Sequence, residues 1–153
     1  ITLLLPEKRL DVDLVAGQTG SQSCVLALLA DGEAELIIFA LYPKAFISWI
    51  KKYQHLISPG ALITDVTGIK SQVVYAIQKL LRDDVEYISA HPMAGREFSG
   101  FEYSTDTLFD EASFIVTPSE SVPQAKLNLI EDFVYSIHFK KVVFATPEEH
   151  DQI

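Results

Sequence analysis

Apolar runs and helically spaced apolar residues alternate along most of this 153-residue chain. Continuous apolar or β-branched runs, which are typical of buried strands, occupy residues 1–5, 12–17, 36–42, 61–66, 85–90, 113–117 and 141–145. Apolar residues recur at helical spacing in 24–29, 46–57, 69–81 and 127–137. This alternation predicts an α/β fold with a doubly wound, mostly parallel sheet and helices on both faces.

The first two predicted strands are joined only by residues 6–11. A parallel pair needs a crossover of about a dozen residues or more, usually a helix, so this connection is too short for one. Either the two strands form a hairpin, or residues are absent from the sequence here. We favour absent residues near 5–11, and again near 32–35, where a helix ending at Gly32 runs directly into the next strand.

Composition restricts the class of protein. With 48% hydrophobic and 22% charged residues, the chain has the composition of a globular domain. A formal net charge of −9 argues against nucleic acid as a partner, and no polybasic segment indicates a membrane surface. The longest apolar run is far below the roughly 20 residues that span a bilayer. We therefore expect a cytoplasmic protein that binds a small molecule, and no spacing of His, Cys, Asp and Glu predicts a metal.

The densest chemistry lies in residues 91–100, which read H-P-M-A-G-R-E-F-S-G. This segment follows the predicted strand 85–90, so we expect His91 just beyond that strand's carboxyl end. Open α/β sheets bind ligands at this edge. An imidazole, with an unperturbed pKa of about 6.5, accepts a hydroxyl proton near neutral pH. His91 is therefore the candidate catalytic base, although a histidine after a buried strand is more often structural.

Other predicted strands end in candidate ligand contacts at the same edge. They are Leu41, Tyr42 and Pro43 after one strand, Thr67 after the next, and Gln18, Thr19 and Ser21 after the second strand of the chain. The turn 17–21 has no acidic residue for the ribose hydroxyls of NAD, and its hydroxyls and amide suit an NADP phosphate slightly better. An ordinary polar turn explains them nearly as well. We assign Asp65 the role of orienting the following turn, with Lys70 capping or pairing with it.

Several of these motifs together resemble prephenate dehydrogenase. The strongest match is His91-Pro92-Met93-Ala94-Gly95 followed by Glu97, Ser99 and Gly100, then Leu108-Phe109 and Thr117-Pro118. Supporting matches are 36–43, 65–70 and Glu148-Glu149-His150-Asp151, so the resemblance spans about residues 36–153. It implies a Rossmann-like dinucleotide-binding domain over residues 1–146. Residues 147–153 would then begin a helix that leads to a helical domain, which in the family makes a homodimer and completes the substrate site.

The resemblance also implies an activity and roles for residues. The activity is NAD- or NADP-dependent oxidative decarboxylation of prephenate to 4-hydroxyphenylpyruvate in tyrosine biosynthesis, with arogenate as the common alternative substrate. His91 matches the family's catalytic histidine, Glu97 a polar residue on the substrate side with Ser99 beside it, and His150 a histidine whose helix borders the active site. Where the family's turn usually has serine, this chain has Gly68, so a hydroxyl contact to substrate would come from Thr67.

One departure from the family keeps other functions open. No G-x-G-x-x-G follows the first strand, although such a loop normally lets backbone amides approach the pyrophosphate. A truncated, non-catalytic nucleotide-binding module is therefore an alternative to the enzyme. A different hydride-transfer enzyme, such as a β-hydroxyacid dehydrogenase, ranks last because the His91 loop does not fit it. The helix start at Thr146-Pro147-Glu148-Glu149, so close to Ile153, predicts that a longer natural chain continues.

Overall fold

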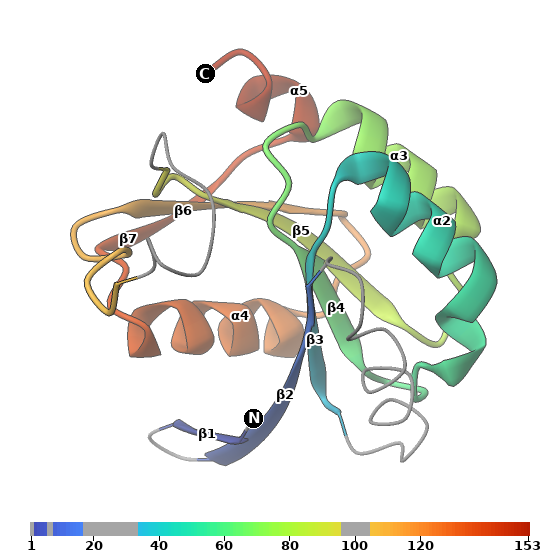
Figure 1. The fold of residues 1–153 in the computed structure, drawn as a ribbon, viewed down its shortest axis with the longest axis horizontal. Coiled ribbons are helices and arrows are strands. Elements are labelled where there is room, and N and C mark those ends of the chain that lie inside the picture. Colours follow the sequence, from blue (N-terminus) through green and yellow to red (C-terminus); the bar gives the residue numbers. More distant parts are fainter. Residues whose placement is uncertain (1, 6–7, 17–33, 96–104) are drawn as a thin grey trace.

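The computed structural model describes residues 2–5, 8–16, 34–95 and 105–153. Within these residues the chain forms a seven-stranded sheet whose spatial order follows the sequence (Figure 1). The strands are β1 (Thr2–Leu5), β2 (Lys8–Ala16), β3 (Leu36–Ala40), β4 (Leu62–Asp65), β5 (Glu86–Pro92), β6 (Ser113–Pro118) and β7 (Lys141–Phe144). The helices are α2 (Pro43–Tyr53), the 3₁₀ helix η1 (Gln54–Leu56), α3 (Ser71–Leu80), α4 (Gln124–Ser136) and α5 (Pro147–His150).

β2, β3, β4 and β5 run parallel to one another, as predicted. β6 runs antiparallel to β5, and β7 runs parallel to β6. The carboxyl ends of β2 to β5 therefore meet at one edge of the sheet, together with the start of β6. Of the predicted ligand contacts, those in the described residues after β3 and β4 lie at this edge: Leu41, Tyr42, Pro43 and Thr67.

The beginning of the chain forms a hairpin. β1 pairs antiparallel with the first half of β2, with Thr2 opposite Asp11 and Leu5 opposite Lys8. The second half of β2 then pairs in parallel with β3, with Val12 opposite Leu36. The chain as given thus forms a hairpin, the alternative that the sequence analysis did not favour. The predicted helix before Gly32, which contains Cys24, lies outside the described residues.

Helices cover both faces of the sheet (Figure 1). Helices α2 and α3 lie on one face, and α4 lies on the other. Because successive strand residues point to opposite faces, Ile37 and Phe39 of β3 pack toward α2 and α3, whereas Leu36 belongs to the cluster under α4. The doubly wound α/β class predicted from the sequence is confirmed.

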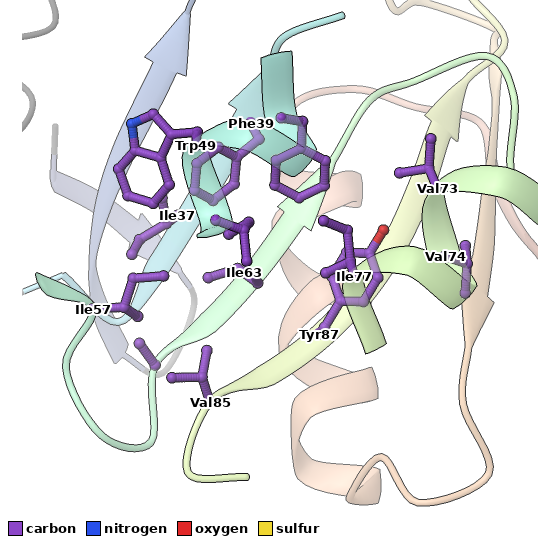
Figure 2. Close-up of a cluster of buried hydrophobic side chains, with 13 residues drawn as sticks. Ile37, Phe39, Trp49, Ile57, Ile63, Val73, Val74, Ile77, Val85 and Tyr87 are labelled. Carbon is purple, nitrogen blue, oxygen red and sulfur yellow. The ribbon is translucent and has the colours of Figure 1, made fainter. Parts of the chain in front are cut away.

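The cluster between the sheet and helices α2 and α3 holds the carboxyl edge of the sheet in place (Figure 2). Pro43 at the first position of α2 starts that helix where β3 ends, because proline lacks the amide hydrogen that a strand or helix interior needs. Phe46 and Trp49 of α2 then pack against Phe39, Phe46 with its ring tilted and Trp49 edge to face, and the ring centroids lie 4.6 and 4.9 Å from that of Phe39. Full burial of each such ring is worth about 1.5–3 kcal/mol, so the segment between β3 and α2 is firmly fixed.

Strand β5 is longer than the sequence predicts. His91 is not beyond the strand but within its last two residues, opposite Ile115 of β6, and Pro92 lies opposite Phe114. The apolar run stops at Ala90, but pairing with β6 extends the ladder past it. Alternation along β5 places Tyr87, Ser89 and His91 on the face that α2 and α3 cover.

Helix α5 is short and well capped. Thr146 accepts a hydrogen bond from the Glu149 amide, and the Glu149 carboxylate accepts one from the Thr146 amide, which is the capping box predicted from the sequence. The helix lies beside the start of α3 (Figure 1). None of the helices in the described part of the chain has the length and apolar character needed to cross a bilayer.

Candidate functional site

Two adjoining clefts lie at the carboxyl edge of the sheet. The larger, about 700 Å³, is lined by residues 40–43, Ala45 and residues 66–69, at the ends of β3 and β4. The smaller, about 360 Å³, is lined by His91, Met93, His150, Asp151 and Ile153 together with Gly68 and Ile69. Gly68 and Ile69 belong to both clefts, so the turn after β4 forms their common wall. Another hollow, of about 470 Å³, lies at the opposite edge and contains none of the predicted site residues. It is lined by the end of α3, the loop from α3 to β5, the start of β5, and Ser119, Ser121 and Val122.

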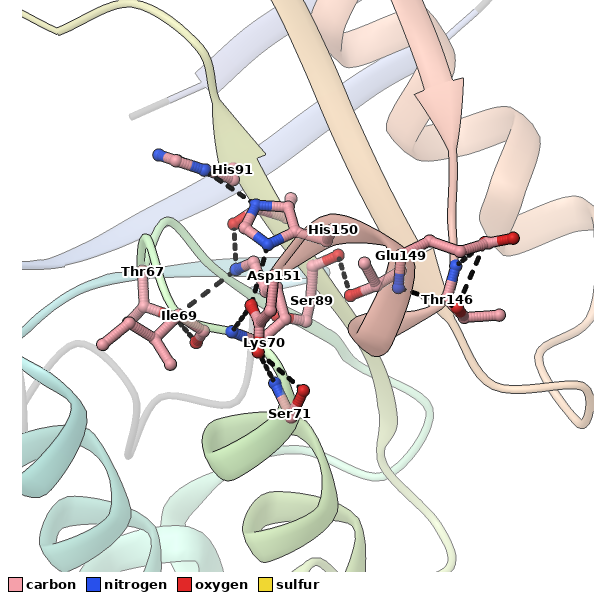
Figure 3. Close-up of polar contacts among 12 residues, drawn as sticks. Thr67, Ile69, Lys70, Ser71, Ser89, His91, Thr146, Glu149, His150 and Asp151 are labelled. Atoms are coloured by element: carbon pink, nitrogen blue, oxygen red, sulfur yellow. Dashed lines mark hydrogen bonds and ion pairs between the residues drawn. The ribbon is translucent and has the colours of Figure 1, made fainter. Parts of the chain in front are cut away.

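His91 and His150, which both line the smaller cleft, contact each other (Figure 3). The two residues are 59 positions apart in the chain, yet His91 Nδ1 lies 2.8 Å from His150 Nε2. The opposite side of the His91 ring faces the turn after β4, because a Cβ added to Gly68 would lie 3.6 Å from both Cε1 and Nε2. Nδ1 of His91 thus contacts His150, and Nε2 faces the cleft wall at Gly68.

The pKa of His91 is lowered from its ordinary value of 6.5. Burial is the main cause because it disfavours the charged imidazolium. The neighbouring His150 and Lys70 lower the pKa further, whereas Asp65 raises it. His91 is therefore neutral at pH 7, which is the state in which an imidazole accepts a proton.

Asp151 anchors His150 to the start of α3. The His150 Nδ1 lies 3.0 Å from Asp151 Oδ1. The same carboxylate accepts the Lys70 amide at 2.8 Å, the Ser71 amide at 2.9 Å and the Ser71 hydroxyl at 2.6 Å. Burial raises the pKa of Asp151, but these donors outweigh it and lower the pKa well below the ordinary range. Asp151 is ionised at neutral pH.

A buried polar network lies beneath the turn. Asp65 Oδ1 accepts the Thr67 amide at 2.9 Å and the Lys70 ammonium at 3.0 Å. Asp65 Oδ2 accepts the hydroxyls of Tyr87 at 2.7 Å and Ser89 at 2.5 Å. The bond to the Thr67 amide agrees with the prediction that Asp65 orients the turn, and Lys70 pairs with it as one of the two predicted alternatives.

This network also reaches the end of β5. Lys70 donates to the carbonyl oxygen of Ala90, the residue before His91. Burial lowers the pKa of Lys70, although Asp65 partly offsets this. Burial, reinforced by the Asp65 charge, raises the pKa of Tyr87 well above its ordinary value. The turn carrying Gly68 and the strand end carrying His91 are therefore tied together by one set of contacts.

The structure brings together part of the predicted site. Leu41, Tyr42 and Pro43 line the larger cleft, and the Tyr42 side chain is 87% exposed. Thr67 lines the same cleft, but its hydroxyl donates to Asp65 Oδ1 at 2.5 Å. To donate a hydrogen bond to a ligand, this hydroxyl would have to leave Asp65.

Other predicted residues cannot be placed. Gln18, Thr19, Ser21, Glu97 and Ser99 lie outside the described residues. Conversely, sequence reasoning assigned no role to Asp151, Ser71, Tyr87 or Ser89. For Asp151 a signal existed in its position next to His150. Among the described residues, no three His, Cys, Asp or Glu side chains are grouped as a metal site would require.

The parallel sheet, its helices on both faces and the clefts at its carboxyl edge define a Rossmann-like nucleotide-binding domain. The family model described as "Prephenate dehydrogenase, nucleotide-binding domain" matches residues 10–143, and the chain belongs to this family.

Relatives agree with this assignment. The prephenate dehydrogenase of Bacillus subtilis (strain 168) is 28% identical over 124 residues, which make up 79% of this chain and 33% of that protein. A crystal structure of prephenate dehydrogenase from Aquifex aeolicus has a TM-score of 0.73 and 28% identity, and the match covers 82% of this chain and 44% of that one. The chain thus spans about a third of the length of the curated relative.

A second structure supports the fold alone. It is the prephenate dehydrogenase from A. aeolicus in complex with hydroxyphenyl propionate and NAD+. Its TM-score is 0.78 at 22% identity, and the match covers 94% of this chain and 62% of that one.

Proposed function

We propose that this chain is the nucleotide-binding part of an NAD- or NADP-dependent dehydrogenase that oxidatively decarboxylates prephenate to 4-hydroxyphenylpyruvate. Arogenate is the alternative substrate. The observation that carries the proposal is the position of His91, a neutral imidazole at the carboxyl edge of the sheet with Nε2 turned toward the cleft wall at Gly68. The family membership and the names of the relatives support the substrate class.

In this function His91 accepts the proton of the substrate's ring hydroxyl at Nε2 while the carbon that bears the hydroxyl loses a hydride. A base whose pKa lies near or below the working pH is present in its neutral form and ready for this step. The bound nicotinamide supplies the hydride acceptor, and the ring carboxylate leaves as carbon dioxide. The chain's own task is to hold the imidazole neutral and aimed at the hydroxyl.

The residues of the larger cleft fit the nicotinamide end of the cofactor. Leu41, Pro43 and Ile69 provide apolar walls at the carboxyl ends of β3 and β4, the place where open α/β sheets bind dinucleotides. Tyr42 and Thr67 add polar groups beside them. The pyrophosphate end is different, because the sequence has no G-x-G-x-x-G loop to present backbone amides.

The remaining residue roles go with this proposal. Glu97, Ser99, Thr67 and His150 would contact the substrate, and Gln18, Thr19 and Ser21 would contact the cofactor. Of these, His150 has support from the structure, since it lines the same cleft as His91. We also propose that the protein forms a homodimer, that it is cytoplasmic, and that its cofactor is NAD or NADP.

The test is turnover of the full-length enzyme with His91→Asn. We expect kcat with prephenate, or with arogenate, to fall by about 10²–10⁴ because general-base catalysis contributes about that much. Affinity for the cofactor should change little. His138→Asn is the matched control, because His138 is exposed and has a φ of 71°, which asparagine tolerates well. Near-normal turnover of His91→Asn would remove His91 from the reaction.

The missing glycine motif favours a second candidate function, a nucleotide-binding or interaction module without catalysis. Isothermal titration with NAD and with NADP separates the two. The enzyme requires binding of at least one cofactor, which the His91→Asn variant retains. If neither cofactor binds to the contiguous polypeptide, the module is the better account.

A further inference from the structure

We propose that Asp151 is a positioning residue that fixes the tautomers of His150 and His91, so that His91 presents an unprotonated Nε2 to the cleft wall at Gly68. The catalytic meaning of this arrangement rests on the proposed function. The tautomers themselves can be measured without any activity. Figure 3 shows the three side chains in line, from the start of α3 to the end of β5.

The first step of the argument concerns Asp151 and its donors. Its two oxygens accept the Lys70 amide, the Ser71 amide and the Ser71 hydroxyl. An ionised carboxylate can only accept hydrogen bonds. His150 Nδ1, which lies 3.0 Å from Oδ1, must therefore carry a proton.

The second step follows the hydrogen bond from His150 Nε2 to His91 and on to His91 Nε2. A neutral imidazole has one donor nitrogen and one acceptor nitrogen, so a proton on His150 Nδ1 makes His150 Nε2 an acceptor. The partner 2.8 Å away is His91 Nδ1, which must then donate. The hydrogen bond made by one ring nitrogen thus sets the state of the other, and His91 Nε2 keeps its lone pair.

The third step concerns the direction of that lone pair. Cε1 and Nε2 of His91 face Gly68, where an added Cβ would lie 3.6 Å from each. Gly68 and Ile69 line both clefts, so Nε2 lies beside the wall that the two clefts share. A substrate hydroxyl there would donate its proton to Nε2, and the resulting imidazolium would keep its Nδ1 hydrogen bond to His150.

An amide at position 151 reverses this arrangement. In Asp151→Asn, an amide oxygen in the place of Oδ2 keeps the bonds from the Ser71 amide and hydroxyl. The NH₂ in the place of Oδ1 loses the bond from the Lys70 amide but faces His150 Nδ1 and donates to it. The proton of His150 then moves to Nε2, which donates to His91 Nδ1, and His91 Nε2 becomes protonated. Because a protonated Nε2 accepts no proton, His91 would keep its place in the fold but could not act as the base.

The experiment is a long-range ¹H–¹⁵N spectrum of the histidine rings at neutral pH. Signals are assigned through their loss in His91→Asn and His150→Gln. We expect His91 and His150 both to be protonated at Nδ1 in the unmodified protein and both at Nε2 in Asp151→Asn. Ser71→Ala is the control, because it removes one donor to Asp151 and leaves the carboxylate, so both rings should keep their Nδ1 proton.

Three results would overturn the proposal. They are a proton on His91 Nε2 in the unmodified protein, a doubly protonated His150 at neutral pH, and unchanged tautomers in Asp151→Asn. In the full-length enzyme, Asp151→Asn should lower kcat on the order of 10²–10⁴-fold with little change in KM, as a wrong histidine tautomer does in a Ser-His-Asp triad. If the protein has no dehydrogenase activity but the spectra are as expected, the proposed function fails and the tautomer assignment stands.

Discussion

Lys70 and Asp65 form an ion pair of 3.0 Å in which neither side chain has any exposed surface. Removing two charges from water is costly, and the pair tolerates it only with further hydrogen bonds. Those bonds come from Thr67, Tyr87 and Ser89 to the carboxylate, and from Lys70 to the Ala90 carbonyl. The pair therefore joins the turn after β4 to the end of β5, where His91 lies.

Replacing Lys70 with Met should destabilise the protein strongly, because it leaves the Asp65 charge buried without its partner. Breaking a buried pair in this way costs about 3–5 kcal/mol. The free energy of unfolding in urea measures the loss. Lys79→Met, an exposed change on α3, which begins directly after Lys70, should cost under about 0.5 kcal/mol. A loss for Lys70→Met as small as that of the control would show that the pair does not stabilise the turn.

Gly60 and Gly68 should respond differently to alanine. Gly60 has a φ of 79° with open space around it, whereas a Cβ on Gly68 meets the His91 ring only at ordinary contact distance. Gly60→Ala should cost about 1–2 kcal/mol through backbone strain, and Gly68→Ala should change stability by less than about 1 kcal/mol. Thermal unfolding of the two variants compares them directly. The reverse order would contradict the geometry of the turn that carries Gly68.

Thr146→Ala should loosen the helix that carries His150 and leads into Asp151. Thr146 and Glu149 form a reciprocal capping box at its start, and loss of an N-cap hydroxyl costs about 0.5–2 kcal/mol. We expect a lower free energy of unfolding and, in the full-length enzyme, a lower kcat. Glu149→Gln, which keeps the capping geometry, serves as the control. Equal effects of the two substitutions would mean that the box does not hold α5.

The sequence predicted most of the described sheet because its strands are apolar on both faces and end at strong signals such as Pro43 and Pro118. It misplaced His91 by ending the strand at Ala90. The two extra pairs, His91 with Ile115 and Pro92 with Phe114, depend on a partner strand that a local pattern does not reveal. The hairpin at the beginning was one of two alternatives, and our preference was for the other, absent residues near 5–11.

Sequence reasoning identified individual residues of the site but not the contacts between them. His91 and His150 were found through motifs, but their mutual contact and the bond from Asp151 to the start of α3 join positions 59, 81 and 80 residues apart. Such contacts depend on how α5 returns to the edge of the sheet. The Asp65 network had a local part, the bond to the Thr67 amide, and that part was predicted. Its contacts from Tyr87 and Ser89 needed the register between β4 and β5.

Stability should decrease as the pH is lowered, first through His91 and then through carboxyl groups that include Asp151. The pKa of His91 is lowered by burial from 6.5, so below about pH 6.5 the unfolded chain binds a proton that the folded protein resists, and the free energy of unfolding decreases. This decrease ends once the pH falls below the lowered pKa of His91. The pKa of Asp151 is lowered from 3.8 by its hydrogen bonds despite burial, so its contribution is lost only below about pH 4.

Urea unfolding from about pH 8 to about pH 3 tests both steps. In His91→Asn the first decrease should shrink while the second stays, and His138→Asn should keep both. If His91→Asn shows the same pH dependence as the unmodified protein, the folded protein does not hold His91 in the neutral state.

The most direct test of the central claim, that His91 is a neutral base at the edge of the sheet, is the pH dependence of kcat/KM in the full-length enzyme. The groups that act on His91 from the packed elements are His150, Lys70 and Asp65, and together with burial they lower its pKa below 6.5. Because kcat/KM reports the base of the free enzyme, it should be level near pH 7. It should then fall about tenfold per pH unit below an apparent pKa under 6.5, and His91→Asn should lose this acid limb. An acid limb at or above pH 6.5, or the same limb in His91→Asn, would contradict the account.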